Sequence, residues 1–307
     1  INLDANGWQS IPYDIYSMYL SVKNKHDVLL VLGTSGCLVM PLLKLIGATV
    51  ILNPDGAEWE RGKWGRFAKM MLYTFDRIGV RYAKYVVADN KVIYERILKL
   101  RSDVNLIEYG GDNAKKADIN KCMLDDLNLV LDKYAFKVCR IVPENNVEMI
   151  LNVFSRNKRQ LVLVGNWGVS DYSRNLKEKY SSFKNINLIG PIYEQDKIDS
   201  LRSNCHLYIH GHSVGGTNPS LVEAINLGLP CIVFNVDYNL ETTENSALYF
   251  NDEESLSDLI DRYWSDSDFL EGLGRKMMSI AKKRYTWKRI IAAYDALFLK
   301  ALKDAKA

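Results

Sequence analysis

Short apolar runs alternate with helical patterns along almost the whole chain, and this alternation constrains the fold more than any other feature. In the first half, amphipathic patterns around residues 36–46, 63–83 and 90–100 separate apolar runs at Asp27–Leu32, Ala48–Leu52, Tyr85–Ala88 and Val104–Ile107. A strand, a helix and a second strand in succession form a right-handed unit of a parallel sheet. The sequence therefore predicts an α/β fold built on parallel sheets.

The second half of the chain repeats the alternation. Its apolar runs are Lys137–Ile141, Leu161–Val164, Ile186–Ile189, His206–Ile209, Cys231–Phe234 and Ala247–Tyr249. The pattern weakens between Gly110 and Phe136, which marks a join. We therefore predict two doubly wound, Rossmann-like domains facing a cleft, at residues 1–130 and 131–285. Residues 286–307 are predicted to form an amphipathic helix that packs back toward the N-terminal domain.

Composition excludes several classes of protein. The 307 residues carry a formal net charge of only +3, which argues against nucleic-acid binding. The longest apolar stretch, Gly36–Gly47, is interrupted by Lys44 and is too short to cross a bilayer. Five widely spaced cysteines indicate no disulfide framework and fit the cytoplasm, and Ile1–Gln9 lacks the features of a signal peptide.

The segment His210–Leu229 has the features of an anion site. An apolar strand is followed by Gly215 and Gly216, and a helical pattern starts after Asn218 and Pro219, which suit the cap and the first position of a helix. Backbone amides and the helix dipole at such a point favour a diphosphate. Glu223, one turn further, is placed to accept hydrogen bonds from ribose hydroxyls. A tight turn beside a solvated glutamate explains the spacing equally well.

Longer motifs resemble those of retaining glycosyltransferases of the GT-B architecture, in family four, and of its rhamnosyltransferase-like subgroup from bacterial polysaccharide synthesis. The resemblance covers nearly the whole chain and is carried by Asn53–Lys69, Tyr82–Asn90, Tyr109–Asp112, Val138–Asn146 and His210–Ala224. It implies that Arg140 binds the donor diphosphate and Glu223 the ribose. It also implies a donor site completed by His212, Gly215, Gly216, Thr217 and Asn218. The co-substrate would be a dTDP- or UDP-sugar, with no metal and no other cofactor.

The chain departs from the family pattern at two positions of the donor site. Gly215 stands where a second glutamate usually contacts the transferred sugar, and Asn145 stands where a lysine often assists the arginine. We interpret these departures as a change of donor. The N-terminal half also lacks the opening strand and glycine-rich loop of such domains, so we expect this domain to be truncated at its start and activity to depend on residues preceding Ile1.

The resemblance implies transfer of a sugar, such as rhamnose or another deoxysugar, to a lipid-linked saccharide with retention at the cytoplasmic membrane face. Arg140 and backbone amides would stabilise the leaving diphosphate, although a strand-end arginine also pairs readily with an acid. Asp55 is the candidate acceptor-side residue, but Asp in Asn53–Gly56 equally suits a turn, and Glu58 shares the ambiguity. The alternatives are a non-catalytic nucleotide-sugar-binding protein of the same fold and a GT-B sugar epimerase.

Two other groups of residues have competing interpretations. Three histidines could point to one side of an extended segment, namely His206, His210 and His212. No cysteine or carboxylate at familiar spacing completes a zinc ligand set, so we expect His210 and His212 to line the donor site. The segment Trp59–Lys84 mixes aromatic residues with basic ones, namely Arg61, Lys63, Arg66, Lys69, Arg77, Arg81 and Lys84. This mixture suits peripheral contact with an anionic membrane, and an amphipathic helix packed on a sheet explains it as well.

Overall fold

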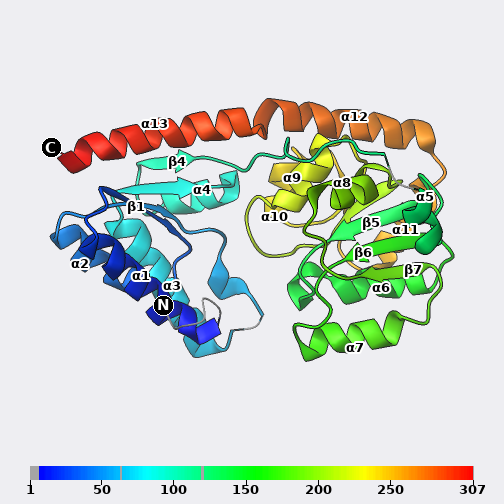
Figure 1. The fold of residues 1–307 in the computed structure, drawn as a ribbon, viewed down its shortest axis with the longest axis horizontal. Helices are drawn as coiled ribbons and strands as arrows, with labels where there is room; N and C mark the ends of the chain where they lie inside the picture. Colours follow the sequence, from blue (N-terminus) through cyan, green and yellow to red (C-terminus); the bar gives the residue numbers. More distant parts are fainter. Residues whose placement is uncertain (1–6, 63, 119–120, 307) are drawn as a thin grey trace. The chain divides into compact units, whose positions relative to one another are not determined.

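The computed structural model describes residues 7–62, 64–118 and 121–306, and its contacts divide the chain into two units (Figure 1). The first unit comprises Ile1–Glu108, Val214–Gly216 and Lys288–Ala307. The second comprises Tyr109–Ser213 and Thr217–Trp287. Apart from the three residues Val214–Gly216, the chain therefore passes between the units after Glu108 and after Trp287, whereas the predicted boundary followed residue 130. Each unit is described by itself.

The first unit is built on a four-stranded parallel sheet in the order β1-β2-β3-β4. Its strands are β1 (Val28–Leu32), β2 (Thr49–Asn53), β3 (Tyr85–Ala88) and β4 (Val104–Leu106). Its first helices are α1 (Ser10–Lys23), α2 (Met40–Leu45), α3 (Arg66–Tyr82) and α4 (Lys91–Leu98), with 3-10 turns at Gly7–Gln9, Cys37–Val39 and Glu58–Glu60.

The order of these four strands never reverses, which differs from the doubly wound pattern predicted for this half. Right-handed crossovers in one direction place their helices on one face of the sheet. The other face is covered by α13 (Trp287–Lys306), from the far end of the sequence, as Figure 1 shows. Ile290 and Leu297 of α13 pack against Ile51 and Val87, and the Tyr85 hydroxyl donates to Asp304 at 2.6 Å.

The second unit contains a six-stranded parallel sheet in the order β10-β9-β8-β5-β6-β7. The strands are β5 (Tyr134–Val138), β6 (Gln160–Val164), β7 (Ile186–Ile189), β8 (Leu207–His210), β9 (Cys231–Phe234) and β10 (Leu248–Phe250). The helices are α5 (Lys121–Asp126), α6 (Val147–Ser155), α7 (Asp171–Tyr180), α8 (Gln195–Ser203), α9 (Pro219–Asn226), α10 (Asp237–Thr242), α11 (Glu253–Tyr263) and α12 (Ser267–Arg284), with a 3-10 turn at Pro143–Asn145. The order reverses between β5 and β8, so this sheet is doubly wound as predicted.

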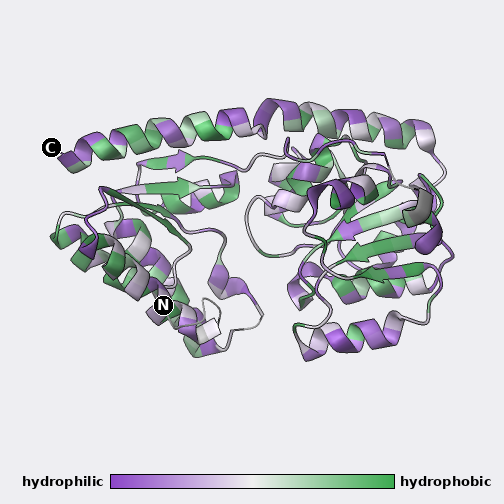
Figure 2. Cartoon of the chain, in the orientation of Figure 1, coloured by the Kyte–Doolittle hydropathy of each residue, from purple (hydrophilic) through white to green (hydrophobic). Residues whose placement is uncertain are grey.

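The core of the second unit lies on both faces of its sheet. Phe136 and Tyr208 belong to one apolar cluster, and their neighbours Ala135 and Leu207 belong to another. Successive side chains of a strand point to opposite faces, so continuous apolar runs produce strands buried on both sides. Figure 2 shows these strands as mostly hydrophobic, whereas the helices carry hydrophobic and hydrophilic residues in alternation.

The predicted strand positions agree closely with the structure, and β3, β7 and β9 have the predicted bounds. The largest difference is at β5, which lies three residues earlier than predicted, at Tyr134–Val138. The strand ends before Arg140 because the chain turns there, with the Val142 amide donating to the Arg140 carbonyl at 3.0 Å. Among the described residues, no helix is long and apolar enough to cross a membrane.

Candidate functional site

Two loops of the second unit meet where its strand order reverses. One follows β5 and runs from Cys139 to Asn146, and the other follows β8 from Gly211. Ligands of open α/β sheets bind at such a reversal, beyond the carboxyl ends of the strands. The backbone amide and hydroxyl of Ser213 both donate to the Glu144 carbonyl at 2.9 Å, and the side-chain amide of Asn146 donates to the Gly211 carbonyl at 2.9 Å. These bonds fix the two loops side by side.

Arg140 lies on the first of these loops with an exposed side chain. Asn145, which occupies the place of the usual lysine, is buried and donates its side-chain amide to the Arg140 carbonyl at 2.7 Å. It therefore holds the shape of the loop and adds no charge. Gly211 allows the loops to approach, because a Cβ there would lie 2.4 Å from the Asn145 carbonyl oxygen.

The second loop leads into α9 with the predicted start. Asn218 has extended backbone angles and its side chain accepts from the Ser220 amide at 3.1 Å, while Pro219 occupies the first turn. Thr217, just before the cap, is buried. His212 stacks on His210 with ring centroids 4.3 Å apart. The second unit thus places Arg140, His212, Thr217 and Asn218 at the ends of adjacent strands.

Gly215 and Gly216 are grouped by their contacts with the first unit. Gly215 has a φ of +142°, a conformation that L side chains rarely adopt. The backbone conformation at position 215 therefore disfavours glutamate, the residue that is absent there. This conformation is consistent with the glycine-rich turn that the sequence predicts.

Glu223 projects from α9 into a set of polar contacts that the sequence did not reveal. Its Oε2 forms an ion pair with Nη1 of Arg202 at 2.6 Å, and its Oε1 accepts from the Asn113 amide at 2.8 Å. Arg202 is only 3% exposed, and Asp199 lies 3.8 Å from the same Nη1. The Glu223 carboxylate is therefore held by partners more than 20 and 100 residues away in sequence, which spacing cannot identify.

Lys137, a buried basic side chain beside the site, was also missed, and His210, which was expected to line the donor site, is fully buried instead. Lys137 of β5 and His210 of β8 are both fully buried, and neither the amino group nor the ring nitrogens have a hydrogen-bond partner in the described parts of the chain. Burial lowers the pKa of Lys137, and burial together with Lys137 lowers the pKa of His210 far below its usual value. A lysine inside an apolar strand is the sequence signal that could have drawn attention to this pair.

The candidate acceptor-side residues lie in the first unit. Asp55 follows β2 with an exposed side chain and a φ of +58°, and its amide donates to the Asn53 side chain at 3.0 Å. This geometry is a turn that aspartate tolerates. Glu58 forms an ion pair with Arg61 at 2.6 Å and accepts from the Trp64 indole at 3.1 Å. Glu58 therefore has a structural role. The exposed Asp55 carboxylate is compatible both with a turn residue and with an acceptor-side residue.

The histidines separate into two environments. His206 bonds through Nε2 to the Trp264 carbonyl at 2.7 Å and stacks against the Trp264 ring, whereas His210 and His212 stack on each other. Burial lowers the pKa of His206. Among the described residues, no three histidine, cysteine or carboxylate side chains are placed to hold a metal ion.

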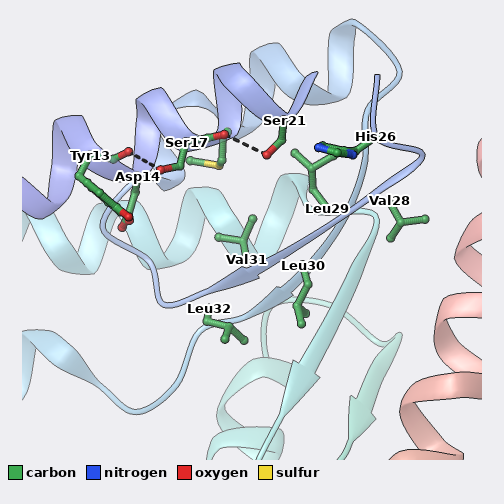
Figure 3. A pocket seen from close by; sticks show the side chains of 11 residues that line it. Tyr13, Asp14, Ser17, Ser21, His26, Val28, Leu29, Leu30, Val31 and Leu32 are labelled. Carbon is green, nitrogen blue, oxygen red and sulfur yellow. Dashed lines mark hydrogen bonds between the residues drawn. The ribbon is translucent and has the colours of Figure 1, made fainter. Parts of the chain in front are cut away.

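A separate pocket of about 270 Å³ lies in the first unit between α1 and β1, and contains none of the predicted donor-site residues (Figure 3). All five residues of β1 line it, together with Asp14, Ser17 and other residues of α1. Alternate side chains of a strand point to opposite faces, so a pocket lined by five consecutive residues runs along the edge of the strand. Burial raises the pKa of Asp14, which accepts a hydrogen bond from Ser35.

Comparison with solved structures shows what this fold resembles. Sucrose-phosphate synthase from Thermosynechococcus elongatus matches with a TM-score of 0.78 at 15% identity, covering 98% of this chain and 82% of the synthase. Anabaena HepE in complex with UDP matches with a TM-score of 0.72 at 13% identity, covering 93% and 81%. A putative UDP-N-acetylglucosamine 2-epimerase from Listeria monocytogenes matches with a TM-score of 0.63 at 15% identity, covering 97% and 82%. These likenesses confirm the predicted α/β fold of GT-B type.

Comparison with family models identifies the family. The model described as a domain of unknown function, DUF1972, matches residues 5–112. No curated protein matches the chain. The model described as glycosyl transferases group 1 matches residues 128–284, which are 157 of the 307 residues. Because this match covers more than half of the sequence, the chain belongs to the glycosyl transferases group 1 family.

Proposed function

We propose that this glycosyltransferase moves a deoxysugar, such as rhamnose, from a dTDP- or UDP-sugar to a lipid-linked saccharide with retention, in the cytoplasmic stage of surface polysaccharide synthesis. The observation that carries the proposal is the pair of joined loops at the reversal of strand order, with Arg140 on one and the start of α9 on the other. UDP in the Anabaena HepE complex supports a nucleoside-diphosphate donor.

The donor diphosphate binds between Arg140 and the start of α9. Arg140 presents a permanent positive charge on a loop fixed by Asn145. The Asn218 cap uses the Ser220 amide, and Pro219 has no N–H, so backbone donors to phosphate come from Gly216–Asn218 just upstream. In a retaining transfer, these donors stabilise the charge that develops on the departing diphosphate.

The ribose binds at Glu223. The two oxygens of a carboxylate offer about four acceptor sites, which is enough for both ribose hydroxyls. The ion pair with Arg202, at 2.6 Å, fixes the direction of the side chain. Gly215 leaves the sugar end without the usual glutamate, which supports a donor that lacks a hydroxyl group for that residue to bind.

The lipid-linked acceptor is supported by the exposed face of α3. Phe67 is 70% exposed and Met70 61% exposed, and Arg66 and Arg77 are exposed on the same helix. Leu72 and Phe75 are buried, so packing against the sheet does not account for the outward apolar residues. Lys63, another residue of the predicted membrane segment, lies outside the described residues. Asp55 is the proposed acceptor-side carboxylate.

The test measures nucleotide binding and then turnover. We expect dTDP or UDP to bind, and Arg140→Ala and Glu223→Gln to weaken that binding at least about tenfold, a loss of about 1.4 kcal/mol. Arg156→Ala and Glu178→Gln, which change exposed residues of the same unit, serve as matched controls. Unchanged binding in both site variants would refute the donor site.

Turnover then separates the activities. Sugar transfer from dTDP-rhamnose to a lipid-linked saccharide, with the anomeric configuration preserved by NMR, is the expected result. Tight nucleotide binding without transfer would indicate the non-catalytic alternative. Conversion of the nucleotide sugar without acceptor would indicate an epimerase, as the structural neighbour from Listeria monocytogenes is named.

A further inference from the structure

The carboxylate proposed to bind ribose is bonded to the segments through which the chain passes between its two units. The first of these segments enters the second unit at Tyr109, and the second leaves that unit after Trp287. The Asn113 side chain donates to Glu223 Oε1 at 2.8 Å and accepts from the Trp287 indole at 3.0 Å. One amide side chain therefore joins Glu223 to Trp287, with its donor and its acceptor each engaged.

The two connecting segments are also bonded to each other. The Gly111 amide donates to the Tyr285 carbonyl at 2.9 Å, and the Trp287 amide donates to the Asp112 carboxylate at 2.7 Å. Gly110 lies against the Trp287 ring so closely that a Cβ would come within 2.6 Å of it. The approach of the second connecting segment thus explains Gly110 and Asp112, whereas Gly111 lies against α9, where a Cβ would come within 2.5 Å of the Val222 carbonyl oxygen.

The other carboxylate oxygen of Glu223 is linked, through Arg202 and Asp199, to the same connecting segment that carries Asn113. Arg202 binds Glu223 Oε2 at 2.6 Å and approaches Asp199, and Asp199 accepts from the Lys115 amide at 3.0 Å. The Asn226 side chain of α9 donates to the Ala114 carbonyl at 3.1 Å. Residues 113–115 are therefore held by α8 and by α9, the helix that carries Glu223.

We propose that Asn113 is a positioning residue: through it, ribose binding at Glu223 reduces the local mobility of the two connecting segments. The proposal rests on the proposed function, since it takes Glu223 as the ribose-binding residue. The two carboxylate oxygens offer about four acceptor sites, so ribose hydroxyls bind without displacing Asn113 or Arg202. A ligand that immobilises Glu223 also immobilises Asn113, which suppresses local opening at Gly111 and Trp287.

Hydrogen exchange on the full chain tests the coupling, with UDP and inorganic pyrophosphate as probes. Pyrophosphate shares the diphosphate of UDP but has no ribose. We expect saturating UDP to slow amide exchange in residues 109–113 and 285–288 at least about fivefold, and saturating pyrophosphate to leave it unchanged. Bound UDP without slower exchange, or equal slowing by pyrophosphate, would overturn the coupling and leave the donor site standing. If only dTDP binds, dTDP replaces UDP as the probe; absence of binding by both nucleotides would overturn the proposed function as well.

Two variants separate coupling from structural support. Asn113→Ala removes both hydrogen bonds, and Trp287→Phe removes only the indole donor. We expect Asn113→Ala to weaken UDP binding about three- to tenfold without changing pyrophosphate binding. Trp287→Phe is expected to bind UDP almost normally and to lose the slowing at 285–288. Asn175→Ala, in an exposed position of α7, is the matched control. Wild-type exchange behaviour in Trp287→Phe, or an equal loss of affinity for both probes in Asn113→Ala, would refute the role of Asn113.

Discussion

Lys137 is a buried basic residue whose stability effect can be measured directly. Its amino group has no hydrogen-bond partner among the described residues, and burial lowers its pKa. In the unfolded chain the same lysine is protonated up to a pH of about 10. Below that pH the unfolded state binds the proton more strongly, so this residue lowers the stability of the folded state.

We expect Lys137→Met to raise the free energy of unfolding at pH 7 by about 1–3 kcal/mol, since methionine keeps the unbranched shape without the buried polar group. The gain should shrink as the pH rises toward about 10, where the unfolded lysine also loses its proton. Denaturant unfolding at several pH values measures both effects. Lys177→Met, at an exposed position of α7, is the control. A destabilised Lys137→Met variant would show that the amino group has a favourable role.

Local sequence was sufficient to predict the roles of some residues of the site and insufficient to predict the contacts of others. Asn218 and Pro219 define the start of α9 through chemistry within three residues, so the cap was predictable. Asn113 and Arg202 reach Glu223 only because folding brings distant segments together. No spacing rule connects such positions, so the contacts that orient Glu223 could not be inferred from a single sequence.

At the scale of elements, the loop between β8 and α9 depends on one backbone conformation. Gly215 has a φ of +142°, yet a Cβ there would meet nothing within 4 Å. Substitution therefore tests backbone strain without a steric clash. A non-glycine residue in such a region costs about 1–3 kcal/mol.

We expect Gly215→Ala to weaken UDP binding about tenfold, because the unliganded loop relaxes to another conformation and must recover the strained one on binding. Gly215→Glu should not restore a sugar contact, for the same reason. Calorimetric titration measures the affinity, and thermal unfolding checks the fold. Gly168→Ala, in a loop with ordinary packing space, is the control. A large fall in thermal stability with normal affinity would show that folding, not binding, needs this conformation.

The elements themselves were largely predictable, whereas their order in space was not. Apolar runs gave strands such as β3 and β9 their bounds, because both faces of each are buried and the pattern is strong. The unreversed order of the first sheet depends on pairings between strands, which the pattern does not encode. Arg140 fell outside β5 because a turn overrides the apolar run that continues through Ile141.

At the scale of the whole molecule, a small net charge conceals an uneven surface. The chain carries only three more basic than acidic residues, yet exposed arginines gather on α3 beside exposed Phe67, Met70 and Tyr73. The Arg77 guanidinium lies over the Tyr73 ring at 4.5 Å. Basic and aromatic side chains in this combination favour the interface of an anionic bilayer.

We expect the full chain to cosediment with vesicles containing about one third phosphatidylglycerol and not with vesicles of phosphatidylcholine alone, because each basic residue near an anionic surface contributes about 1 kcal/mol. Binding should weaken as salt rises from low to physiological concentration, where charges are screened within about 8 Å. Arg66→Glu with Arg77→Glu should abolish binding, and Phe67→Ser should weaken it at all salt concentrations. The matched control is Arg174→Glu with Arg275→Glu, since both arginines are exposed outside α3. Equal loss of binding in the control pair, or equal binding to both kinds of vesicle, would show that α3 is not a membrane-contact surface.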